Sequence, residues 1–120
     1  MEPKLFDSER KVMQVLWEAD APLAAREIAS TLSETVGWNK NTTYTVIKKC
    51  VDKGVIERRD PGFQCIPLIR REQVQAAAAA ELVEKVFDGS ASLLFASLLS
   101  GKQLPSEEVR RLRALIDELE

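Results

Sequence analysis

The chain has 120 residues, of which 45% are hydrophobic and 30% charged, and its formal net charge is −2. This composition predicts one or two small globular domains. With no histidine and only two cysteines, Cys50 and Cys65, the sequence argues against a metal site, a nucleophilic triad or any other catalytic centre, and we expect no cofactor. No run of 18 apolar residues and no signal-peptide pattern is present, so we expect a cytoplasmic protein that does not insert into a membrane.

The first 54 residues predict three helices. The first is expected to follow an N-cap at Asp7 and to end near Ala19–Asp20, before Pro22. The second is expected from about Ala24 to Thr35, with apolar residues at helical spacing. Asn39 is the expected N-cap of the third helix, which should end before a glycine suited to a helix C-terminus.

The third helix has two distinct faces. Its expected buried face consists of Val46, Ile47, Cys50 and Val51. Its expected outward face consists of Asn41, Thr42, Thr45, Lys48, Lys49 and Lys53. Hydroxyl and amide groups can reach base edges, and ammonium groups can neutralise phosphates, so this face suits a helix that enters a DNA groove. An ordinary solvated helix face remains the alternative.

A β-hairpin is expected after the third helix. Val55–Arg59 and Phe63–Leu68 flank the turn Asp60–Gly62. Arg58 and Arg59 would contact phosphates, or alternatively protect the edge of the sheet. Residues 38–59 contain six basic and two acidic residues, a net charge of +4, so local charge favours a polyanion although the whole chain is acidic.

Three helices followed by a hairpin predict a winged helix-turn-helix, whose third helix enters the major groove. The fold class is therefore mainly α: a winged helix-turn-helix domain at residues 1–70, followed by a three-helix dimerisation domain at residues 71–120. The residues predicted to contact DNA are Lys40, Asn41, Thr42, Tyr44, Thr45, Lys48, Lys49, Arg58 and Arg59.

The C-terminal 50 residues are rich in large apolar side chains, yet they are too few to form an independent core. Two chains sharing one core would resolve this, and a dimer of winged helices would read an inverted repeat. Packing of these helices on the N-terminal domain of the same chain is the alternative. The residues predicted at the dimer interface are Leu82, Val86, Leu94, Phe95, Leu98, Val109, Leu112 and Ile116.

The sequence resembles the penicillinase-repressor family of bacterial regulators (BlaI/MecI/CopY), over nearly the whole chain. The matching segments are residues 12–18 (VMQVLWE), 25–28 (AREI), Trp38 with 42–47 (TTYTVI), Lys53–Gly54, Pro67–Leu68, Gly89–Ser90, Leu93–Leu94, Leu104 and 106–108 (SEE). The resemblance implies a homodimeric repressor that binds a pseudo-palindromic operator in double-stranded DNA, and it places the positions of Asn41, Thr42, Thr45 and Lys49 at the DNA.

In the best-known members of that family, a membrane sensor protease system ends repression by cutting an Asn-Phe bond. Ser97-Leu98 stands at the matching position here, which makes it the possible cleavage locus. The absence of the Asn-Phe pair argues against release by the same proteolysis. The copper-responsive branch has a C-terminal cluster of cysteines that this chain lacks. The resemblance thus implies control of β-lactam resistance or of another stress-response gene. The alternative function is a protein-interaction scaffold built on a winged helix, without sequence-specific DNA binding.

Overall fold

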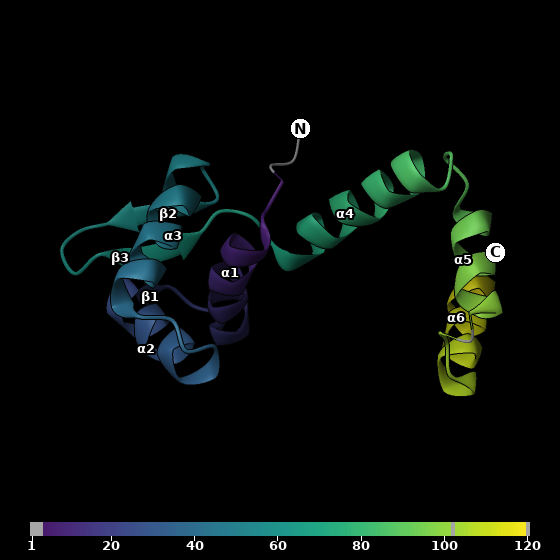
Figure 1. Cartoon of the computed structure of the whole chain (residues 1–120), viewed down its shortest axis with the longest axis horizontal. Helices are drawn as coiled ribbons and strands as arrows, with labels where there is room; N and C mark the ends of the chain where they lie inside the picture. The colour runs from purple at the N-terminus through teal and green to yellow at the C-terminus, as the bar shows by residue number, and fades with distance from the viewer. Residues whose placement is uncertain (1–3, 102, 120) are drawn as a thin grey trace. The chain divides into compact units, whose positions relative to one another are not determined.

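The computed structural model describes residues 4–101 and 103–119 of the chain. Its elements are α1 (Asp7–Ala19), β1 (Leu23–Ala24), α2 (Ala25–Thr35), α3 (Lys40–Asp52), β2 (Ile56–Arg59), β3 (Gln64–Pro67), α4 (Arg71–Val86), α5 (Ala91–Ser100) and α6 (Ser106–Glu118) (Figure 1). They form two compact units, Met1–Ala78 and Ala79–Glu120, so the start of α4 belongs to the first unit. Among the described residues, no helix has the length and apolar character needed to cross a membrane.

The start of α1 differs from the expectation by one residue. Phe6 has the extended backbone of an N-cap, and Asp7 is already the first helical residue, so the expectation of Asp7 as the N-cap was wrong. The Phe6 backbone N–H donates to Glu9 Oε1 at 2.8 Å, which satisfies a donor that the helix leaves free. Asp7 instead pairs with Arg10 at 2.9 Å, one turn further along the exposed surface.

Helix α3 begins as the sequence predicts, because Asn39 Oδ1 accepts a hydrogen bond from the Thr42 backbone N–H at 2.8 Å. The helix ends before Gly54, which has a φ of +80°, a value that suits glycine. Its buried residues include Thr43, which the apolar pattern does not reveal, whereas Val51 is only half-buried.

A three-stranded antiparallel sheet has the order β1-β3-β2. The hairpin of β2 and β3 confirms the expected wing, with Arg58 opposite Cys65 and Arg59 opposite Gln64. Strand β1 was not expected, since two residues are too short to show an alternating pattern. The Ala25 backbone N–H donates to the Phe63 carbonyl oxygen at 2.9 Å and thereby joins the start of α2 to the wing turn.

One hydrophobic core joins α1, α2, α3 and the sheet within the first unit. Its buried residues are Val12, Met13, Leu16, Ala25, Ile28, Leu32, Val46, Ile47, Cys50, Val55, Ile56, Cys65 and Ile69. The three helices and the hairpin share this core, so the outward face of α3 and the wing belong to one packed unit. This arrangement confirms the predicted winged helix-turn-helix.

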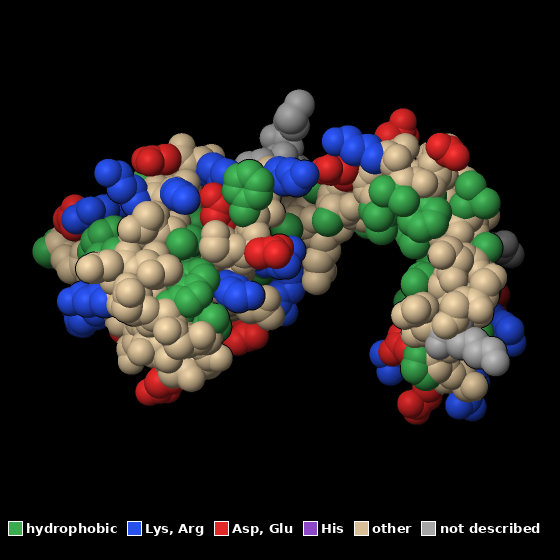
Figure 2. Space-filling model, in the orientation of Figure 1, with side chains coloured by type: hydrophobic (Ala, Val, Ile, Leu, Met, Phe, Trp, Pro, Cys, Tyr) green, Lys and Arg blue, Asp and Glu red, His purple; other side chains and the backbone are tan. Residues whose placement is uncertain are grey.

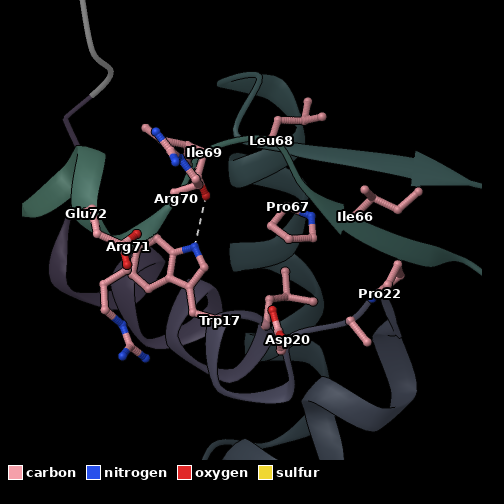
Figure 3. A pocket seen from close by; sticks show the side chains of 12 residues that line it. Trp17, Asp20, Pro22, Ile66, Pro67, Leu68, Ile69, Arg70, Arg71 and Glu72 are labelled. Atoms are coloured by element: carbon pink, nitrogen blue, oxygen red, sulfur yellow. Dashed lines mark hydrogen bonds between the residues drawn. The ribbon is translucent and has the colours of Figure 1, made fainter.

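The segment between β3 and α4 is attached to α1 through Trp17. The Trp17 indole Nε1–H donates to the Ile69 carbonyl oxygen at 2.9 Å, and the Arg71 guanidinium lies 5.8 Å from the indole ring centroid. Figure 3 shows both side chains beside a surface cavity of about 640 Å3, which Pro22 and Pro67 also line. These contacts attach the start of α4 to α1 within the first unit.

The second unit exposes much of its apolar surface. Among its described residues none is buried, although α5 and α6 are rich in leucine. Ser90 is the N-cap of α5, because its Oγ accepts from the Leu93 backbone N–H at 3.2 Å. Apolar side chains lie on the surface of this unit in Figure 2. A surface of this kind is typical of a helical unit that packs against another chain.

Candidate nucleic-acid interface

The outward face of α3 is polar, basic and open to solvent. Its exposed members among the predicted DNA contacts are Lys40, Asn41, Thr42, Thr45, Lys48 and Lys49. The buried residues of the same helix face the core, so helical geometry directs these six side chains away from the protein. The face combines ammonium groups with short hydroxyl and amide groups, the combination that can contact phosphates and base edges together.

Tyr44 occupies a different place from the rest of that set. It is half-buried, and its ring meets the Phe63 ring at a centroid distance of 5.8 Å with an interplanar angle of 74°. The Lys40 ammonium lies 5.6 Å from the centroid of the Tyr44 ring. Tyr44 therefore packs α3 against the wing and also lies at the edge of the outward face of α3.

The wing carries two exposed arginines, each paired with a nearby acid. Arg58 Nε lies 3.3 Å from Asp60 Oδ2, and Arg59 Nε lies 2.5 Å from Glu57 Oε2. The Arg58 guanidinium also lies 3.7 Å from the centroid of the Phe63 ring. Because these ion pairs face solvent they are weak, so phosphate groups can replace the carboxylates.

The prediction that Lys53 belongs to the outward face of α3 was wrong. Its ammonium group is half-buried and donates to Glu9 Oε1 at 2.5 Å, while it also lies 4.4 Å from the Phe6 ring centroid. Burial acts to raise the pKa of Glu9, but hydrogen bonds from Lys53 and from the Phe6 backbone N–H outweigh it and leave the pKa below its usual value. Lys53 therefore joins α3 to α1 and is committed to a structural contact.

A groove runs between α3 and the wing. It has a volume of about 470 Å3 and is lined by Tyr44, Thr45, Lys48, Val51, Asp52, Arg58 and Phe63. Four of these residues are predicted DNA contacts, and the fold brings them together from two separate elements. Phe63 was not predicted as part of the site. The sequence signal that could have identified it is the aromatic residue directly after the Pro-Gly turn.

The two cysteines, Cys50 and Cys65, lie in the core as free thiols. Burial raises the pKa of Cys50 to about 12, with the Glu9 carboxylate adding to the effect, and burial raises the pKa of Cys65 to about 11. Both thiols are therefore protonated at neutral pH and poorly nucleophilic. Among residues 4–101 and 103–119, no cluster of three or more His, Cys, Asp or Glu side chains could hold a metal ion.

The predicted dimerisation residues lie along α4, α5 and α6. Leu82, Val86, Phe95 and Ile116 are exposed, whereas Leu94, Leu98, Val109 and Leu112 are half-buried. The candidate cleavage locus falls in the second half of α5, where Ser97 is exposed and Leu98 half-buried. The Ser97 carbonyl oxygen accepts from the Gly101 backbone N–H at 3.0 Å, so this peptide unit is part of the helix.

Three helices, a hairpin wing and a basic, hydroxyl-rich third helix define a winged helix-turn-helix protein with the features of a nucleic-acid interface. The penicillinase repressor family model matches residues 5–118. The chain therefore belongs to the penicillinase repressor family.

Relatives and solved structures agree with this assignment. The penicillinase repressor of Bacillus licheniformis is 24% identical over 118 residues, covering 97% of this chain and 91% of that protein. The methicillin resistance regulatory protein MecI of Staphylococcus aureus (strain N315) is 22% identical over 116 residues, covering 95% and 94%. The solution structure of the DNA-binding domain of the repressor BlaI matches with a TM-score of 0.53 and 28% identity, covering 57% of this chain and 85% of that one.

A second solved structure contains DNA. The solution structure of monomeric Bacillus licheniformis BlaI in complex with the blaP half-operator matches with a TM-score of 0.51 and 28% identity, covering 58% of this chain and 87% of that one.

Proposed function

We propose that this protein is a transcriptional repressor that binds a pseudo-palindromic DNA operator as a homodimer. The observation that carries the proposal is the groove between α3 and the wing, which brings Thr45, Lys48 and Arg58 to one exposed surface. The similarity to BlaI, which has been solved with a half-operator, supports the same use of the fold here.

Repression would follow from binding alone, without catalysis. The exposed lysines of α3 and the wing arginines would supply affinity that falls steeply with salt, because each phosphate contact releases condensed counterions. Asn41, Thr42, Tyr44 and Thr45 would supply selectivity through contacts to base edges in the major groove. An asparagine can make two hydrogen bonds to adenine, so Asn41 suits a base-reading position.

Dimerisation would double the recognised sequence. A single winged helix contacts only a few base pairs, whereas two copies related by a two-fold axis contact an inverted repeat. The apolar side chains that the second unit leaves exposed, including Phe95 and Ile116, supply a surface for the second copy. We expect Phe95→Glu to yield monomers in sedimentation experiments and to weaken operator binding, because a charge buried in an apolar interface is unfavourable.

The names of the two relatives refer to penicillinase and to methicillin resistance. We propose that this chain likewise controls β-lactam resistance or another stress-response gene. If a membrane sensor protease ends repression here as well, the bond between Ser97 and Leu98 is where cleavage would fall, and helix α5 would have to open to admit a protease.

The proposal is tested by selecting DNA from a randomised duplex library with the purified protein, followed by a salt titration on the selected sequences. We expect an enriched inverted repeat and a steep fall of affinity with salt. A protein-interaction scaffold would give neither enrichment nor salt-dependent affinity, and that result would overturn the proposal.

A further inference from the structure

Phe63 lies where three elements of the DNA-binding unit meet. Its carbonyl oxygen accepts from the Ala25 backbone N–H at 2.9 Å, which ties the wing turn to the start of α2. Its ring meets the Tyr44 ring of α3 edge to face, with centroids 5.8 Å apart. The other partner of that ring is Arg58 on β2, whose guanidinium lies 3.7 Å from the ring centroid.

The position of Arg58 depends on these contacts. Its side chain is 48% exposed, and a long exposed side chain normally samples many rotamers. Here the guanidinium lies over the Phe63 ring and is bounded by the Asp60 carboxylate at 3.3 Å. Cation–π attraction favours this placement because the face of an aromatic ring is electronegative. The guanidinium therefore lies between the Phe63 ring and the Asp60 carboxylate, on the groove that Thr45 and Lys48 of α3 also line.

We propose that Phe63 is a positioning residue for DNA binding, one that holds the Arg58 guanidinium in register with α3 through the Tyr44 ring; this inference rests on the proposed function. Phe63 itself need not touch DNA. It fixes the distance between the phosphate-binding Arg58 on the wing and the base-reading helix α3. Arg58 can then contact the DNA backbone while α3 lies in the groove.

The arrangement also assigns a role to Asp60. Its carboxylate occupies a position beside Arg58 that an oxygen-bearing anion can take, and it is weakly held because its own side chain is 63% exposed. A DNA phosphate would displace it from the guanidinium, which stays on the Phe63 ring. The arginine thus keeps its place before and after binding, and less rotamer entropy is lost when DNA binds.

The test compares three substitutions in the full chain: Phe63→Leu, Phe63→Tyr and Arg58→Ala. Leucine keeps apolar bulk and the backbone contact but removes the ring face, whereas tyrosine keeps the ring. Binding to a fluorescein-labelled DNA duplex of mixed sequence is followed by anisotropy between about 50 and 200 mM salt, where phosphate contacts dominate affinity. Thermal unfolding of each variant reports folding separately.

We expect Phe63→Leu to reduce the salt slope by about 0.9 per protomer, as the loss of one phosphate contact would, with an affinity loss of roughly tenfold per protomer at 0.1 M salt. Phe63→Tyr should stay within about twofold of the parent protein, since the ring face remains. Adding Phe63→Leu to Arg58→Ala should change the slope no further, because the two residues act through the same contact.

Three results would overturn the inference. One is a normal salt slope for Phe63→Leu, even with weaker binding, which would indicate a structural role alone. Another is a double variant in which the two losses add, and a third is a Phe63→Tyr variant that behaves like Phe63→Leu. Failure of the parent protein itself to show salt-dependent binding would overturn the proposed function as well, so the two failures are distinguishable.

Discussion

Substitution of Thr43 directly tests how the packing of α3 against the core contributes to stability. It lies on the inward side of α3, with a side chain that is 0% exposed, and its Oγ1 has no hydrogen-bond partner in the described part of the protein. A buried hydroxyl that has lost its bonds to water without gaining others destabilises the folded state. We therefore predict that Thr43→Val stabilises the protein.

The magnitude follows from the cost of the buried, unpaired hydroxyl. A buried hydroxyl without a partner costs about 1–3 kcal/mol in protein mutational data. Valine is β-branched like threonine and replaces the hydroxyl by a methyl group, so neither a cavity nor a change in helix propensity should offset the gain. We expect the free energy of unfolding to rise by about 1–2 kcal/mol. In a unit of this size, each kcal/mol raises Tm by about 4–8 °C.

Urea and thermal unfolding followed by circular dichroism measure this change. Thr45→Val is the matched control, since Thr45 lies on the same helix with an exposed side chain. We expect its free energy of unfolding to change by no more than about 0.5 kcal/mol. Thr43→Val should also leave DNA affinity unchanged, because the side chain faces the core. A loss of stability of about 1 kcal/mol or more in Thr43→Val would refute the reasoning.

Three further predictions concern charge and reactivity. The folded-state pKa of Glu9 lies below its usual value of 4.5, so the stability it provides is present above that pH and is lost as the pH falls through the lower folded pKa. Urea titrations below pH 4.5 should therefore show a smaller loss of stability for Glu9→Gln than for the parent, and equal losses would contradict this. The thiols of Cys50 and Cys65 are buried and have pKa values of about 12 and 11. A thiol reagent at pH 8 should therefore label both only after unfolding. Rapid labelling of the native protein would contradict the burial of these thiols. Lys49→Ala should weaken binding to all DNA sequences and lower the salt slope by about one, which anisotropy titrations would test against an unchanged slope.

The sequence was most informative where a local rule applies. Asn39 was predicted as an N-cap from its residue type and from the helix pattern that follows it, and the hydrogen bond to Thr42 confirms it. The wing was predicted from a turn with a proline and a glycine between two short expected strands, and the β2–β3 hairpin confirms it. Both signals depend on residues that are neighbours in the chain.

Features that depend on distant residues were missed or misplaced. Lys53 looks like an outward residue of α3 by helical spacing, yet Glu9 on α1 draws it into a half-buried ion pair. The contact joins residues 44 positions apart, and no local pattern encodes it. Phe63 likewise gains its place only when the hairpin brings it against Tyr44. Apart from Lys53, the outward residues of α3 could therefore be predicted from helical spacing, whereas the contacts that join the wing to α3 could not.

In the second unit, the sequence predicts an apolar interface but not which of its leucines form it. The apolar positions on α4, α5 and α6 predict an interface, and the structure leaves several of these side chains exposed. Leu93, which the dimer prediction did not include, is 50% exposed and lies on α5 beside residues that it did include. Apolar spacing shows that a helix face must be covered, whereas the choice between neighbouring leucines depends on the geometry of the partner helix.

The central claim is that the outward face of α3 and the wing form the DNA interface, and nuclear magnetic resonance tests it most directly. The isotope-labelled protein would be titrated with the duplex that it selects from a randomised library. We expect the largest amide shifts on residues 39–49 and 57–63, with smaller changes on α2. Shifts concentrated in the second unit, or none on α3 at DNA concentrations that saturate binding, would contradict it.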